Sequence, residues 1–140
     1  MKLKNFLLSS TPFSIDSGIL IVRLVVGIYF ILHGHQLFNS KAMEGFANYL
    51  SKNLYFPLPL LMAYLRTGAE LFGGIMLVLG LLTRLGAFLI MFTMLVATFT
   101  AGKGDIFGHA EMTVVYATIC LTIIFIGSGK YSLEKYLLKS

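Results

Sequence analysis

The sequence predicts an all-α membrane protein: a transmembrane bundle of four antiparallel helices with both termini on the cytoplasmic side. Hydrophobic residues make up 57% of the 140 residues and charged residues only 12%, whereas a soluble domain carries about 25% charge. The mean hydropathy is +0.84, and the apolar residues fall into four long runs. Polar surface is too scarce to coat a soluble globule, and the length suits one domain spanning residues 1–140.

Four apolar runs are the predicted membrane spans: residues 18–37, 58–82, 85–100 and 108–126. A spanning helix needs about 20 apolar residues, with a range of roughly 17–25, so the third run is short. Backbone N–H and C=O groups find no water in hydrocarbon and must bond within their own segment. Each run is therefore predicted to be a helix.

The connections between the runs set the direction of the helices. The longest connection contains residues 42–51, where Phe46, Tyr49 and Leu50 follow Met43 at helical spacing. This pattern predicts a short amphipathic helix in the membrane interface. The other connections are short, and short connections make neighbouring helices antiparallel.

The basic residues predict which side of the bundle faces the cytoplasm. The net charge is +5. The side that includes both termini carries more of the basic residues: Lys2, Lys4, Arg84, Lys130, Lys135 and Lys139, against Lys41, Lys52 and Lys103. The richer side is expected inside. No basic strip interleaved with aromatic residues occurs, so the lipid bilayer and not a nucleic acid is the expected partner. The apolar segment Phe6 to Leu8 is too short for a signal peptide, and we expect the N-terminus to be retained.

Ionisable residues inside the spans are the candidate site. A charge in hydrocarbon costs about 2.5–3.5 kcal/mol on insertion scales, so these side chains are expected to face one another. Arg66 and Glu70 are four residues apart and share a helix face, and by depth Glu70 can pair with Arg66 or with Arg23. A second, outer group is expected around a polar pocket: His33, Gln36, Arg66, His109 and Glu111.

Each of these residues also has a purely structural interpretation. Arg23 can extend its charge to the cytoplasmic interface as an anchor. The pair of Arg66 and Glu70 can fix helix packing and do nothing else. His33 can be a hydrogen-bonded structural residue, and Glu111 can complement a helix dipole.

No reaction follows from these residues alone. The single cysteine, Cys120, excludes an intrachain disulfide, and His33 and His35 point to different faces, so no metal site is predicted. Phosphate-binding loops and serine-protease motifs are absent from the sequence. Whether the chain is an enzyme stays open, and no cofactor is fixed.

The order of several short motifs resembles the DoxX family of small four-helix bacterial membrane proteins. The resemblance covers about residues 17–136, and the motifs are Arg23-Leu-Val-Val-Gly27, His33-Gly34, Pro57-Leu-Pro59, Glu70-Leu-Phe-Gly73-Gly74, Thr83-Arg84, Glu111 and Gly127-Ser-Gly129. It implies a multi-pass protein of the bacterial cytoplasmic (inner) membrane. Similar proteins include a subunit of an archaeal thiosulfate:quinone oxidoreductase and a component of a mycobacterial thiol and superoxide detoxification complex. The resemblance carries over His33, Arg66, Glu70 and Glu111 as polar-site candidates. It leaves unsupported any role for the lysine that many members have at the position of His35-Gln36.

Two functional hypotheses follow from this resemblance. The first is an accessory, quinone-interacting subunit of a redox or thiol-stress system, with a separate redox chain as partner. The quinone would lie between spans one, two and four near Tyr29, Phe30 and Tyr116, with His33 and Glu111 handling protons and Arg66 polarising a carbonyl. The second is a non-enzymatic membrane scaffold or small-molecule carrier. A transporter is disfavoured because no inverted repeat is visible, and homo-oligomerisation stays open.

Overall fold

The chain is entirely helical, without strands, in the part that the computed structural model describes, residues 2–10, 12 and 14–138. Lys139, one of the basic residues behind the predicted topology, lies outside these ranges. The α-helices are α1 (Lys2–Leu8), α2 (Ile15–Gly34), α3 (Ser40–Leu54), α4 (Pro59–Leu79), α5 (Thr83–Phe99), α6 (Glu111–Ile126) and α7 (Leu133–Leu138), and a 3₁₀-helix, η1 (His35–Phe38), continues α2. Each of the four apolar runs forms one long helix.

Two of these helical segments, Ile15–Phe38 and Pro59–Leu79, are long and apolar enough to cross a membrane. Helices α5 and α6 are also apolar but have 17 and 16 residues. At 1.5 Å per residue they span roughly 24–26 Å, less than the hydrocarbon core of about 30 Å. The membrane-crossing length is therefore clear for α2 and α4 and marginal for α5 and α6.

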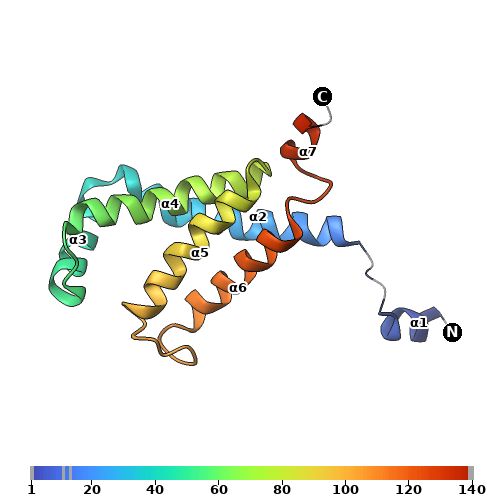
Figure 1. The fold of residues 1–140 in the computed structure, drawn as a ribbon, viewed down its shortest axis with the longest axis horizontal. Coiled ribbons are helices and arrows are strands. Elements are labelled where there is room, and N and C mark those ends of the chain that lie inside the picture. Colours follow the sequence, from blue (N-terminus) through green and yellow to red (C-terminus); the bar gives the residue numbers. More distant parts are fainter. Residues whose placement is uncertain (1, 11, 13, 139–140) are drawn as a thin grey trace.

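The four long helices pack in chain order, α2 on α4, α4 on α5 and α5 on α6, with α3 across α4 (Figure 1). The start of α2 meets the segment after α6, where the N–H of Lys130 donates to Oδ1 of Asp16 at 2.9 Å. The end of α4 meets the start of α7, where the N–H of Glu134 donates to the carbonyl of Gly80 at 2.9 Å. Neighbouring long helices therefore alternate in direction.

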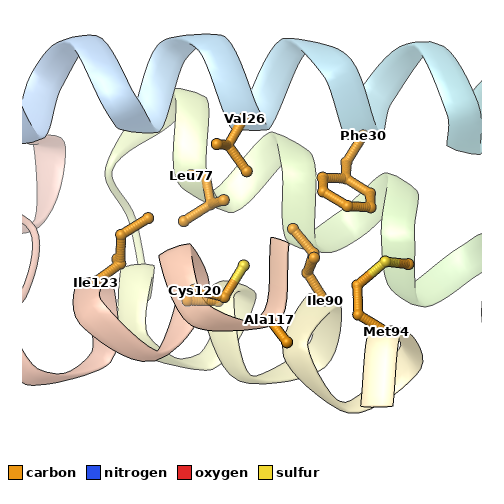
Figure 2. Close-up of a cluster of buried hydrophobic side chains, with 9 residues drawn as sticks. Val26, Phe30, Leu77, Ile90, Met94, Ala117, Cys120 and Ile123 are labelled. Atoms are coloured by element: carbon orange, nitrogen blue, oxygen red, sulfur yellow. The ribbon is translucent and has the colours of Figure 1, made fainter. Parts of the chain in front are cut away.

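One apolar core joins the four long helices. Figure 2 shows its side chains converging from α2, α4, α5 and α6; the buried residues are Val26, Phe30, Leu77, Ala87, Ile90, Met94, Ala117, Cys120 and Ile123. Helices α2 and α6 meet through side chains, with the rings of Phe30 and Tyr116 edge to face at 5.1 Å. This core fixes the helices that carry the candidate polar residues.

Glycines allow α4 to touch both of its neighbours. A Cβ atom at Gly74 would lie 2.7 Å from the carbonyl oxygen of Gly27 in α2, and one at Gly73 would lie 2.9 Å from that of Gly86 in α5. A Cβ atom at Gly34 would lie 2.6 Å from the Cα of Leu71. Small residues at such crossings let helix backbones approach closely. Consecutive glycines of α4 thus serve two different helix pairs.

Helix α3 is longer than the predicted 42–51 segment. It begins early because Oδ1 of Asn39 accepts hydrogen bonds from the N–H groups of Lys41 and Ala42 at 3.1 and 3.3 Å, the usual role of an N-cap asparagine. It ends at Tyr55, whose φ of 55° is left-handed. Its apolar face packs over α4: Met43, Ala47 and Leu50 are buried with Ala63.

The outer faces of the long helices are apolar. Every one of the four exposes several large hydrophobic side chains, among them Ile21, Val25, Leu32, Leu61, Phe72, Phe88, Phe92, Leu121 and Phe125. Soluble monomers rarely expose contiguous apolar patches above a few hundred Å². A surface of this kind is the surface that lipid requires.

Candidate functional site

The centre of the candidate site is an ion pair on α4. Nη2 of Arg66 lies 3.0 Å from Oε1 of Glu70, and the two side chains are 38% and 4% exposed, respectively. The i, i+4 spacing that the sequence offered places both groups on one helix face. A carboxylate this deeply buried needs a cation beside it, and Arg66 supplies that cation while keeping contact with the exterior.

His33 of α2 is the second ionisable neighbour of Glu70, close enough for its charge to act on the carboxylate. The contact between Gly34 and Leu71 explains this position. Helices α2 and α4 are antiparallel, so the residues that precede this contact, His33 and Glu70, project to the same side of the interface. The structure thus brings three of the predicted site residues together.

Two aromatic rings of α2 lie beside His33. Its ring centroid lies 4.9 Å from that of Tyr29 and 6.2 Å from that of Phe30, and Tyr116 of α6 lies 5.8 Å from Tyr29. Nδ1 of His33 is 3.0 Å from the carbonyl oxygen of Tyr29. Because a carbonyl only accepts hydrogen bonds, Nδ1 carries the hydrogen, and the neutral ring keeps its lone pair on Nε2.

On the other side of the ion pair, Arg66 forms part of the wall of an apolar groove of about 600 Å³ between α3, α4 and α5. We call this the α3–α4–α5 groove; its lining is Phe46, Tyr49, Leu50, Leu54, Phe56, Met62, Leu65, Arg66, Ala69, Phe92, Thr93, Val96, Ala97, Thr100 and Ala101. Cζ of Arg66 lies 4.8 Å from the ring centroid of Phe46. Nε of Arg66 is buried and has no hydrogen-bond partner.

The sequence analysis did not find this groove. Its aromatic residues come from α3, from Phe56 in the connection after α3, and from α5, and the sequence does not place these segments side by side with Arg66. The one signal was the aromatic stripe Phe46 and Tyr49 on α3, whose partner helix could not be named from spacing alone. The groove also differs in location from the predicted quinone position between spans one, two and four.

The other predicted outer residues are exposed. Glu111 is exposed in the first turn of α6, where a carboxylate complements the helix dipole. Gln36 is exposed in η1. His109 is exposed with its Nδ1 3.4 Å from Oδ2 of Asp105. In the described ranges, none of the three hydrogen-bonds or forms an ion pair with Arg66, Glu70 or His33.

Arg23 is buried and forms no ion pair with Glu70, one of the two partners that depth allowed for that carboxylate. The residue is 1% exposed. Its Nε donates to the carbonyl of Leu77 at 3.0 Å, and its Nη1 donates to those of Ser128 and Tyr131 at 2.6 and 2.9 Å. Three backbone carbonyls solvate the charge in place of a carboxylate. Arg23 therefore ties α2 to the end of α4 and to the segment after α6.

No candidate metal site occurs among the described residues. They contain no cluster of three or more His, Cys, Asp and Glu side chains. Cys120 is free and completely buried in the core. A thiol in such apolar surroundings is a poor nucleophile, which leaves Cys120 a packing role.

Comparison with known proteins gives the family. The DoxX family profile matches residues 18–103. The chain belongs to the DoxX family. This DoxX protein is 30% identical over 127 residues to a Bacillus subtilis protein named "Putative oxidoreductase CatD", covering 90% of this chain and 91% of the relative. It is 32% identical over 126 residues to an uncharacterized protein of Haemophilus influenzae, covering 84% and 89%. No solved structure matches.

Proposed function

We propose that this DoxX protein is a multi-pass subunit of a redox system in the bacterial cytoplasmic membrane, and that it binds a quinone in the α3–α4–α5 groove. The family and the oxidoreductase name of the Bacillus subtilis relative support a redox role. The observation that carries the ligand is Arg66, which lines a largely apolar groove and whose buried Nε has no hydrogen-bond partner.

The proposed membrane arrangement is a four-helix bundle with both termini inside. The apolar outer faces of α2, α4, α5 and α6 support it, as do the alternating directions of these helices. The shortness of α5 and α6 is accommodated by local thinning of the bilayer, which costs fractions of a kcal/mol per Å. Arg84, Lys130 and Lys135 then lie on one side with the termini, as the positive-inside rule requires.

The ion pair selects a neutral ligand. The charge of Arg66 is already offset by Glu70 at 3.0 Å, so a phosphate headgroup would bring an uncompensated negative charge beside a buried carboxylate. A carbonyl oxygen needs only a donor, which Nε supplies. The apolar lining suits a flat ring and a prenyl chain, since ligand sites combine apolar walls with a few placed polar groups.

A bound quinone supplies two-electron, two-proton carrier chemistry. Within this chain, Arg66 orients the carbonyl by donating from Nε, and the rings of Phe46 and Phe92 cover the groove against water. Glu70 holds the guanidinium in place. Electrons would come from a separate redox chain docked on this subunit.

Binding of a short-chain quinone to the purified protein in lipid nanodiscs, measured by calorimetry, tests the proposal. A hydrogen bond to a charged donor contributes about 1.5–3 kcal/mol, so Arg66→Gln should raise Kd roughly 10- to 100-fold. Ala97→Phe, which fills the groove, should do the same. Leu61→Phe adds the same ring on an exposed position of α4 outside the groove and is the matched control. Absence of binding, or equal Kd values in all variants, contradicts the proposal.

The alternative function is a membrane scaffold whose ion pair is structural. The contact of Arg66 with Phe46 at 4.8 Å favours it, because the guanidinium thereby fastens α3 to α4. A scaffold predicts that Glu70→Gln destabilises the protein while wild type and variants alike bind no quinone. The same calorimetric titration separates the two functions.

A further inference from the structure

We propose that His33 carries protons between the water at its end of α2 and the buried carboxyl group of Glu70. The proton transfer itself needs no ligand. This inference therefore rests on the proposed function only for the step that uses the proton at the bound quinone. His33 keeps the proton-handling role that the sequence predicts for it, with Glu70 in place of Glu111 as its partner.

Glu70 has few neighbours that can exchange a proton with it. Its side chain is 4% exposed, which leaves almost no direct access to water. The guanidinium of Arg66 has only donor groups and no acceptor nitrogen, so it stabilises the carboxylate but cannot relay a proton. Helix α5 contributes no ionisable side chain between Leu85 and Phe99.

The other elements packed against α4 also carry titratable side chains, but these do not provide a proton path to Glu70. Helix α3 and η1 contribute Lys41, Glu44, Tyr49, Lys52 and His35, all of them exposed. His33 projects to the same side of the α2–α4 interface as Glu70, beside the contact of Gly34 with Leu71. Its imidazole ring has a nitrogen that can both accept and donate a proton.

The geometry of His33 suits a relay. The residue is exposed near the end of α2, and its Nδ1 is committed to the carbonyl of Tyr29 at 3.0 Å. That bond and the tilted ring of Tyr29, 4.9 Å away between centroids, hold the imidazole in one orientation. The lone pair of Nε2 is left to take up a proton from water.

The transfer balances in two steps. Nε2 first takes a proton from hydronium, which leaves water and an imidazolium ring. The imidazolium then gives one proton to a carboxylate oxygen of Glu70, and His33 returns to its neutral form. Protonated Glu70 no longer offsets Arg66, so the guanidinium then presents a full positive charge to the α3–α4–α5 groove. The reverse sequence releases the proton to water.

Infrared spectroscopy after a rapid pH jump tests this path in the full-length protein in nanodiscs, without quinone. The carboxyl band of Glu70 is identified by its loss in Glu70→Gln. Positioned proton transfer contributes about 10²–10⁴-fold to rates, so His33→Ala and His33→Gln should slow the response of this band by at least about tenfold. Added imidazole should restore the rate in His33→Ala, a rescue that a structural role would not give.

His35→Ala is the matched control. His35 is also exposed, and its Nδ1 lies 2.8 Å from the carbonyl of Leu32, yet it does not act on Glu70. Its loss should leave the rate unchanged. An unchanged rate in both His33 variants, or a wild-type Glu70 band that does not respond to pH, overturns the inference. Quinone binding measured separately on the same variants shows whether the proposed function stands without the relay.

Discussion

Removing Arg66 should destabilise the protein more than removing Glu70, although the two residues share one ion pair. The asymmetry follows from burial, because Glu70 is 4% exposed and Arg66 is 38% exposed. Arg66→Met strands a carboxylate in the core, whereas Glu70→Gln leaves a cation that still reaches the exterior and the ring of Phe46.

The magnitudes follow from these exposures. Breaking a buried pair by deleting one partner costs about 3–5 kcal/mol when the remaining charge stays buried, so Arg66→Met should cost roughly 3 kcal/mol at neutral pH. Glu70→Gln should cost about 1 kcal/mol, since the remaining guanidinium is partly solvated. Protonation removes the stranded charge of Glu70, so the cost of Arg66→Met should shrink as the pH falls.

Reversible unfolding of the purified variants in mixed micelles, followed by circular dichroism at two pH values, measures these free energies. The double variant Arg66→Met/Glu70→Gln should be more stable than Arg66→Met alone, because no charge is then stranded. Equal costs for the two single changes, or a larger cost for Glu70→Gln, would refute the assignment of Glu70 as the buried member.

Three further predictions concern the scaffold around the site. Arg23→Met should speed amide hydrogen exchange across residues 127–138, measured by mass spectrometry. The reason is that three hydrogen bonds from a charged group are lost, and each contributes about 1.5–3 kcal/mol. Unchanged exchange would argue against Arg23 as the residue that ties this segment to α2. Gly74→Leu should force α2 from α4 and lower the melting temperature by several degrees, whereas Gly68→Ala, which meets open space on the same helix, should stabilise by about 0.5–1 kcal/mol. Cys120 should react with maleimide only after unfolding, and rapid labelling of the folded protein would disprove its burial in the core.

Most of what could be predicted from the sequence came from local patterns, such as residue spacing within one helix and runs of apolar residues. The pairing of Arg66 with Glu70 is a matter of helical spacing, and the four long helices follow from apolar runs. These features depend on residues near each other in the chain or on a single helix, where spacing determines geometry.

The features that the sequence missed depend on distant segments. The partners of Arg23 are backbone carbonyls more than fifty positions away, and a carbonyl leaves no residue-specific signal in a sequence. The groove beside Arg66 requires α3 to lie across α4 near α5. Helices α1 and α7 have 7 and 6 residues, too few for a periodic pattern to be read from them. The sequence groups Glu111 with His33 only by their depth in the predicted spans. Depth does not determine the direction in which a side chain points around its helix axis.

Photolabelling with an azidoquinone in nanodiscs tests the central claim most directly, because it reports where a quinone binds and not only whether it binds. The account predicts covalent label on peptides of α3, α4 and α5 that line the groove, displaced by excess unlabelled quinone and strongly reduced in Arg66→Gln. Label confined to α2 and α6, or label in the groove that Arg66→Gln leaves unchanged, would contradict it.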